Sequence, residues 1–283
     1  MKATGNTFRV GMKALCVSAA MLAATGALHA QQISPAKKPA DATETESQAQ
    51  ARDILMRMAE FMARTQHFSV TVRGGYDSVQ ESGQKIEFAE SRKVTLSRPD
   101  RLLVEGERSD GSKTLTVFNG KEIMLIDAAR NVYATAPQPG GVDDTIVHFV
   151  RDLGMRLPLA VLLVSQLPAE MKNRVRSIEY VEKTRIYGAP SHHLAARGDT
   201  VDFQIWVSEG DKPLPQRIVI TYREAPGQPD FRAQLSDWNL APAITDTTFS
   251  VEPPDGAQKV AFAAQLPRAA PAAGKMETRK GAK

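Results

Sequence analysis

The first regular pattern of apolar and polar positions has the period of a helix. Apolar side chains recur at intervals of three and four residues, at Ile54, Leu55, Met58, Phe61 and Met62, with charged side chains between them. This spacing places the apolar residues on one face. It predicts a helix over residues 47–65 whose apolar stripe packs on a core.

From residue 68 onward the period changes to two, as in half-buried strands. We predict strands at residues 68–72, 86–90, 92–98, 102–106, 114–118, 122–126, 175–184, 192–196, 201–208, 216–222 and 231–238. Gly74-Gly75 and residues 81–83 read as turns, and Asn119-Gly120 is typical of a type I′ hairpin turn. Because short connectors join antiparallel neighbours, about ten to eleven strands form an antiparallel meander that is long enough to curl towards a barrel.

Two helices interrupt this β pattern in the middle of the chain. Residues 137–141 form a break, and residues 143–153 and 157–166 each read as helical. The second segment is apolar on nearly every side, so it is buried or faces apolar surroundings on both sides. The pattern as a whole predicts one α+β domain.

The first thirty residues have the features of a cleavable export signal. Lys2, Arg9 and Lys13 precede an apolar run over residues 14–28, which ends before the small residue Ala30. That run suits a signal peptide and is shorter than the about 20 residues needed to span a membrane. We expect cleavage after Ala30 and a periplasmic mature protein; an uncleaved N-terminal anchor is the alternative.

Cleavage would change both the cysteine content and the charge. Cys16, the single cysteine, leaves with the signal, which excludes disulfides and cysteine-based sites from the mature chain. The residue before Cys16 is not small, which argues against a lipid anchor. The formal charge is +4; loss of three of the 36 basic residues and none of the 32 acidic ones leaves +1. A nearly neutral domain argues against nucleic acid as a partner.

Composition divides the chain into four parts. Residues 1–30 are the signal peptide, and the Pro-, Ala- and Thr-rich residues 31–46 read as a disordered linker. Residues 47–262 form the folded domain. Residues 263–283 are rich in alanine, proline and basic side chains, which predicts a disordered basic tail.

A search for catalytic and metal-binding motifs gives little. The letters S-x-x-K occur at Ser82 and Lys85, inside a predicted turn and without the other motifs of such enzymes. His192 and His193 are adjacent on a predicted strand, so their side chains point to opposite faces and do not share a metal ion. We therefore predict no catalytic residue, no metal and no cofactor.

The concave face of a curled apolar sheet must be covered or occupied. The two helical regions, around residues 54–62 and 157–164, are natural covers. The residues leave two alternatives open: a completely sealed core, or a site of lipid size under helices that can lift.

Four segments resemble the outer-membrane lipoprotein carrier and sorting (LolA/LolB-like) superfamily. They are residues 94–101 (VTLSRPDR), 117–127 (VFNGKEIMLID), 235–238 (LSDW) and 249–256 (FSVEPPDG). Their order and spacing hold over residues 50–260, and the chain is most similar to predicted periplasmic proteins of unknown function in that superfamily. The resemblance implies an incomplete antiparallel β-barrel around a hydrophobic cavity, covered by an N-terminal helix and a central helical lid.

The resemblance also implies a role for Arg98, because in the carrier the arginine before this proline holds the lid shut. Alternation places Val94, Leu96 and Arg98 on one strand face, and we expect Arg92 outside that set. Burying an arginine requires a partner. A structural ion pair at the rim is the alternative to a gating role for Arg98.

These observations lead to a non-catalytic periplasmic protein that binds or carries acyl chains or lipidated proteins, with transient membrane contact allowed. The expected site residues, aliphatic side chains lining the cavity and one arginine latching the lid, are Leu96, Arg98, Leu102, Val104, Leu162 and Val164. The alternative is an envelope-stress regulator of the same architecture that binds an inner-membrane protein. A hydrolase has only the S-x-x-K letters in its favour.

Overall fold

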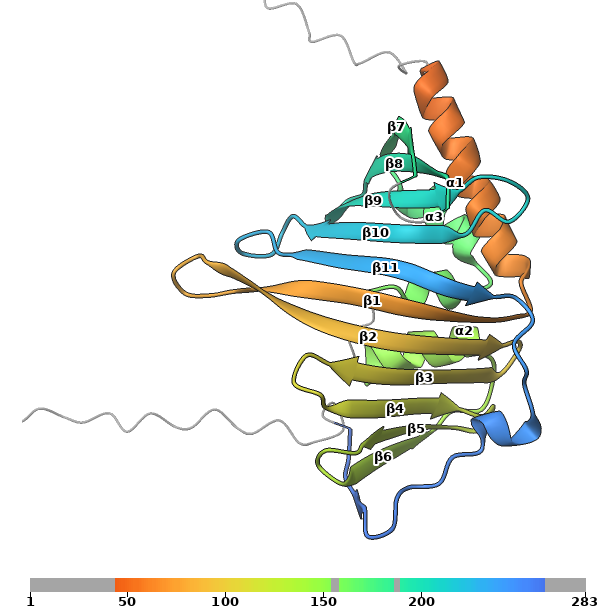
Figure 1. Ribbon diagram of the computed structural model, residues 1–283, viewed down its shortest axis with the longest axis vertical. Helices are drawn as coiled ribbons and strands as arrows, with labels where there is room; N and C mark the ends of the chain where they lie inside the picture. The colour runs from red at the N-terminus through yellow and green to blue at the C-terminus, as the bar shows by residue number, and fades with distance from the viewer. Residues whose placement is uncertain (1–43, 154–157, 186–188, 263–283) are drawn as a thin grey trace, which may run out of the picture. The chain divides into compact units, whose positions relative to one another are not determined.

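The computed structural model describes residues 44–153, 158–185 and 189–262, which form a large sheet with helices packed on it (Figure 1). The strands are β1 (His67–Val79), β2 (Lys85–Ser97), β3 (Arg101–Arg108), β4 (Lys113–Phe118), β5 (Glu122–Asp127), β6 (Val132–Pro137), β7 (Ser177–Thr184), β8 (Ser191–Arg197), β9 (Val201–Ser208), β10 (Pro215–Tyr222), β11 (Asp230–Asn239) and β12 (Gln258–Lys259). The helical segments are α1 (Glu46–Arg64), α2 (Val142–Val147), the π-helical η1 (His148–Asp152), the 3-10 turns η2 (Ala160–Leu163) and η3 (Asp246–Phe249), and α3 (Leu167–Arg174).

The twelve described strands lie in one open sheet, in the order β12-β6-β5-β4-β3-β2-β1-β11-β10-β9-β8-β7. The two meanders, β1–β6 and β7–β11, join where β1 pairs antiparallel with β11. The short β12 pairs in parallel with β6. Because the edge strands β7 and β12 are not neighbours, the barrel is incomplete, and the predicted α+β fold with an open antiparallel barrel is confirmed.

Helix α1 begins and ends within one residue of the predicted bounds. Thr45 and Gln48 form a capping box at its start, each side chain bonding the other's backbone N–H. Its buried face contains Ile54, Leu55 and Met58 and belongs to one continuous apolar core shared with the sheet and the other helices. Intrinsic capping and burial therefore agree, which explains why the sequence pattern located this helix well.

The central cover differs from the prediction in its second half. Helical structure over residues 142–152 confirms the first predicted helix, although its last turn is π-helical. The expected ten-residue helix over residues 157–166 is wrong: residues 160–163 form a short 3-10 turn, and α3 starts only at Leu167, with Pro168 in its first turn. Residues 154–157 lie outside the described part of the chain. A proline is well placed to start a helix and poorly placed to continue one. Pro168 therefore starts α3 and separates it from the 3-10 turn over residues 160–163.

The strand pattern was predicted correctly in type but not in every boundary. Residues 74–75 are not a turn: β1 continues through both glycines, and a Cβ at Gly74 would lie 2.6 Å from the Arg232 carbonyl oxygen of β11. Glycine here permits close approach of a neighbouring strand. The two strands predicted at 86–90 and 92–98 are one strand, β2, while β6 and β12 were not predicted.

The Asn119-Gly120 hairpin connects β4 and β5 as predicted, but its turn is not type I′. Gly120 has φ +85°, whereas Asn119 is not among the described residues with positive φ. Instead, the Asn119 side-chain oxygen accepts hydrogen bonds from the backbone N–H groups of Lys121 and Glu122, at 3.0 and 3.1 Å. An asparagine side chain can organise a turn in this way without a left-handed backbone.

A charged cluster on the outer face holds the long β1–β2 hairpin, which extends past the ends of the adjacent strands (Figure 1). Arg232 on β11 pairs with Asp77 at 2.8 Å, Glu87 at 3.1 Å and Asp230 at 2.8 Å. Asp77 and Glu87 face each other across β1 and β2. Their like charges would repel without Arg232, and its hydrogen bond holds the pKa of Asp77 below its usual value.

Replacing Arg232 with methionine should lower the free energy of unfolding at pH 7 by about 2 kcal/mol, because buried Asp77 loses a charge-assisted hydrogen bond. A depressed folded-state pKa stabilises the fold above the unfolded pKa, and this contribution disappears as the pH falls through the folded-state value. The difference between wild type and Arg232→Met should therefore shrink below about pH 4. Urea unfolding between pH 3 and 7 measures it.

Arg73→Met provides the control for this measurement. Arg73 is exposed on the same outer face of β1 and makes one long hydrogen bond, 3.4 Å, to Ser236. Its replacement should change stability by less than about 0.5 kcal/mol. A pH-independent loss in Arg232→Met would show that packing of the side chain, rather than its charge, stabilises the hairpin.

Candidate functional site

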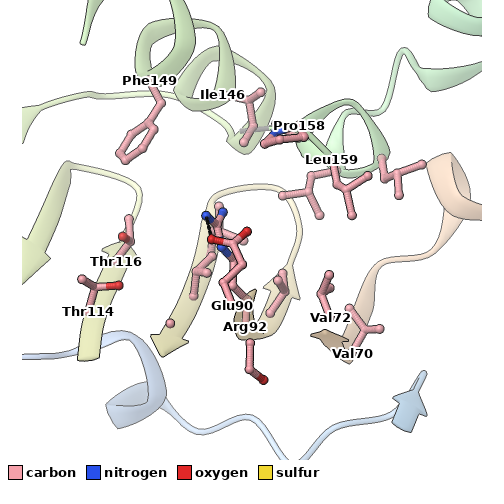
Figure 2. A pocket seen from close by; sticks show the side chains of 18 of the residues that line it. Val70, Val72, Glu90, Arg92, Thr114, Thr116, Ile146, Phe149, Pro158 and Leu159 are labelled. Carbon is pink, nitrogen blue, oxygen red and sulfur yellow. Dashed lines mark hydrogen bonds and ion pairs between the residues drawn. The ribbon is translucent and has the colours of Figure 1, made fainter. Parts of the chain in front are cut away.

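A cavity of about 300 Å³ lies between the sheet and the lid, which we define as α2, η1 and η2. Strands β1–β5 and β11 supply one wall, the lid supplies the other, and Met62 of α1 also lines the cavity. Figure 2 shows Ile146, Phe149, Pro158 and Leu159 on the lid side, with Val70 and Val72 on the strands opposite. The size lies at the lower end of the range for small-molecule sites.

The sheet wall is apolar near the lid because successive strands align their apolar residues. Val70, Val94, Val104, Thr116 and Leu125 are paired in sequence across β1–β5 and all line the cavity. Since paired residues in a sheet point to the same face, these five side chains form one transverse row. Thr116 is the single polar member, so this part of the wall suits hydrocarbon.

The next row along the strands runs from Val72 through Arg92, Gly106 and Thr114 to Asp127, and its polar members lie at the mouth of the cavity. The Arg92 guanidinium donates to the Glu90 carboxylate at 2.8 Å, a contact visible in Figure 2. On β5, the Asp127 carboxylate accepts hydrogen bonds from the backbone and the guanidinium of Arg130, each at 3.1 Å. The cavity therefore passes from an apolar interior to a charged opening, which is the pattern of an amphiphile site.

Arg98 joins α1, the β2–β3 turn and the lid. Its side chain is 8% exposed; Nε donates to the Thr65 carbonyl at 3.2 Å, and Nη1 lies 3.6 Å from the Asp143 carboxylate on α2. Asp143 in turn accepts hydrogen bonds from the backbone N–H and hydroxyl of Ser165, which follows η2. Arg98, Asp143 and Ser165, which we call the lid network, thus tie both ends of the lid to the barrel.

The pKa of Arg98 reflects both its burial and its contact with Asp143. Burial lowers the pKa of the Arg98 guanidinium, and the nearby Asp143 carboxylate opposes that change. An arginine nevertheless stays charged in proteins. Its Nη2 has no hydrogen-bond partner among the described residues. Arg98 consequently needs Asp143 and Thr65 to compensate its loss of hydration.

The six sequence-predicted site residues occupy three kinds of position. Leu102, Val104 and Leu162 line the cavity. Leu96 is fully buried in the core, and Val164 packs against that core; neither lines the cavity. Arg98 lies just beyond the end of β2, in the lid network.

The expectation that Arg92 lies outside the apolar face is wrong. Arg92 pairs with Val72 and Gly106 and lines the same cavity as Val94. The period of two along β2 already places Arg92 and Val94 on one face, so the signal was present in the sequence. Glu90, on that face as well, and Asp127 on β5 were missed because a lone charged residue at a strand end usually faces water.

The histidines are used in local contacts. His192 Nδ1 lies 3.3 Å from the Tyr180 hydroxyl, whereas His193 stacks on Trp206 with ring centroids 4.0 Å apart. The two side chains thus have separate surroundings, as adjacent strand positions require. In the part of the chain that the structure describes, no three His, Cys, Asp or Glu side chains group closely enough to hold a metal ion. Nor does any described helix have the length and apolar character to cross a membrane.

The architecture is a lidded open barrel with an internal apolar cavity. The chain belongs to the family described as predicted periplasmic protein (DUF2092), whose model matches residues 51–263. The similarity to predicted periplasmic proteins seen in the sequence is thereby confirmed. No curated protein has a matching sequence.

Several solved structures share parts of this architecture. An uncharacterised conserved protein from Thermus thermophilus is 15% identical, with 75% of this chain and 99% of that chain covered and a TM-score of 0.45. LprF from Mycobacterium bovis is 14% identical, with 70% and 96% covered and a TM-score of 0.45. A LolA superfamily protein from Nitrosomonas europaea is 13% identical, with 70% and 96% covered and a TM-score of 0.38. Similarity at this level carries no information about the ligand of this chain.

Replacing Arg98 with methionine should loosen the lid without unfolding the sheet, because the lid network loses its central cation. Backbone amides of α2 should exchange with solvent about tenfold faster or more, while amides of β1 and β2 keep their protection. Hydrogen–deuterium exchange read by mass spectrometry checks this. Arg64→Met, at an exposed position near the end of α1, is the matched control and should leave α2 unchanged. Equal exchange of α2 in all three proteins would contradict the role of Arg98.

Proposed function

We propose that this protein binds the acyl chain of a lipid or of a lipidated protein in the cavity beneath the lid, without covalent chemistry. The observation that supports this is the continuous apolar wall that Leu102, Val104 and Leu162 contribute to. Apolar surface that is open to a cavity gains free energy when hydrocarbon covers it. The charged mouth would keep the polar end of the ligand near water.

In this proposal the lid network governs access. Arg98 holds Asp143, and Asp143 holds Ser165, so breaking these polar contacts would free α2 and η2 together. Such contacts exchange with water at small net cost, because each group regains hydration when it separates. Opening of α2 would leave the part of α1 that packs against β7 and α3 covered, whereas η2 contacts α1 and Met62 of α1 lines the cavity.

The proposal includes export to the periplasm, with cleavage after Ala30 at a site outside the described residues. The family description as predicted periplasmic protein supports the compartment. A chain freed from its signal would diffuse between membranes and make only transient contact with either. A binding protein of this kind needs no cofactor and no metal.

A second candidate function is recognition of a membrane protein's periplasmic segment through the lid. Val147 and Val150 are 48% and 46% exposed and lie three residues apart on the outer side of α2 and η1. Exposed apolar side chains on a helical cover can contact a partner protein. Co-purification of an inner-membrane protein that is lost in Val147→Lys/Val150→Lys, with chain uptake absent, would favour this candidate.

Filling the cavity should abolish uptake. Val104→Trp places a large side chain in the apolar row, and we expect at least tenfold weaker binding of a fluorescent fatty acid to delipidated protein, with the fold retained. Glu105→Trp is the matched control, since the neighbouring residue on β3 is exposed on the other face and should leave binding unchanged. Absence of saturable uptake in wild type and in Arg98→Leu would overturn the proposed function.

Affinity should also depend on chain length. Each methylene group transferred from water contributes about 0.8 kcal/mol, or about fourfold in affinity. A dry cavity of about 150 Å³ accommodates one benzene ring, so twice that volume holds roughly twelve carbon atoms. Titration of saturated fatty acids of increasing length should show this gain up to about twelve carbons and a plateau beyond. No dependence on length would show that the chain does not enter the cavity.

A further inference from the structure

The sheet wall of the cavity changes from apolar to charged over one residue pair along the strands. The row after Val70, Val94 and Val104 contains Arg92, Gly106 and Thr114, paired across β2, β3 and β4. Gly106 has no side chain, and the Thr114 hydroxyl oxygen lies 2.7 Å from the position that a Cβ would take, so this hydroxyl lies over Gly106. Arg92, Gly106 and Thr114 line the cavity at the end of its apolar part, where the polar end of a bound chain would be.

The charged side chains at this end of the cavity are not all paired. Glu90 is occupied by Arg92 at 2.8 Å, and Asp127 is occupied by Arg130 at 3.1 Å. Arg108, which also lines the mouth, lies opposite Glu90 in the register of β2 and β3. Its guanidinium has no ion-pair contact within 4.0 Å among the described residues. Glu107 also lines the mouth, but strand alternation directs its side chain towards the other face of β3. The charge without an ion pair on the cavity face is therefore that of Arg108, which is positive.

The site is better suited to an acidic group than to a cation or a neutral group. Glu90 accepts from one side of the Arg92 guanidinium and orients it, and among the described residues no other acceptor takes its remaining N–H groups. Two arginines and a hydroxyl that line the mouth of the cavity provide the donors that phosphate and carboxylate oxygens require. An ammonium group would instead face Arg92 and Arg108.

We propose that Gly106, Arg92, Arg108 and Thr114 form a head-group site for the acidic end of a single-chain amphiphile, with a phosphate or carboxylate bound by the two arginines. This inference rests on the proposed function, because the chain of the same molecule occupies the apolar cavity. Glu90 acts as a positioning residue for Arg92. A volume of about 300 Å³ limits the ligand to one chain.

Probes with one chain and different heads test this assignment. Dodecyl phosphate, laurate, dodecyl maltoside and dodecyltrimethylammonium share a twelve-carbon chain, and their affinities for full-length delipidated protein can be measured by titration calorimetry below micelle formation. Dodecyl phosphate and laurate should bind about tenfold tighter or more than the maltoside. Their advantage should decrease as salt is added.

Variants connect this preference to the named residues. Arg92→Met/Arg108→Met should reduce the affinity for dodecyl phosphate to that for the maltoside and leave the maltoside unchanged within about twofold. Lys93→Met is the matched control, because Lys93 lies next to Arg92 on β2 and pairs with Glu105 on the opposite face at 3.9 Å. It should keep the preference for an acidic head.

Each contrary outcome has a distinct meaning. Equal affinity for all heads, or a preference that survives in the double variant, would overturn the head-group site and leave chain binding intact. If inorganic phosphate competes as strongly as dodecyl phosphate, the site binds a free anion, and the proposal that its ligand is an amphiphile is wrong. No binding of any probe would overturn the proposed function itself.

Discussion

One physical constraint organises this molecule: the sheet is open, so the apolar side of its curve has to be removed from water by other elements. β7 and β12 end the sheet without meeting, and no closure of the sheet hides the inner face. Helix α1 covers the part near β7 with a well-packed stripe. The lid covers the part formed by β1–β5 with short, irregular segments, and the cavity lies there. A less regular cover leaves unfilled space beneath it.

The lid network follows from the same constraint. The lid buries apolar side chains such as Val142, Phe149 and Leu162, and polar contacts from Arg98 through Asp143 to Ser165 hold it in addition. Polar contacts of this kind are directional and reversible at small net cost in water. The α1 stripe is packed along a whole helix and belongs to the same continuous core as Val142 and Leu162 of the lid. The lid network therefore adds polar contacts to one shared apolar core.

The sequence was sufficient for features in which local and tertiary preferences agree. Helix α1 combines a capping box with an apolar stripe, and the strands combine alternation with turn residues. The sequence was insufficient where contacts with other segments of the chain determine the local structure. Gly74 belongs to a strand because β11 approaches it, β6 is a six-residue strand ending in Pro137, and α3 begins at Leu167 with Pro168 in its first turn, separate from η2. The charged mouth appears only when pairing places Arg92 beside Gly106 and Thr114, since a single charged residue on a strand resembles a solvated position.

The central claim is that an amphiphile fills the space beneath the lid. Mass spectrometry of organic extracts from freshly purified full-length protein, without prior delipidation, tests it most directly. The account predicts a single-chain acidic lipid present at close to one molecule per protein, and absent from extracts of a variant whose cavity is filled. Extracts without any acyl compound, or with the same lipids at the same amounts in both proteins, would contradict it.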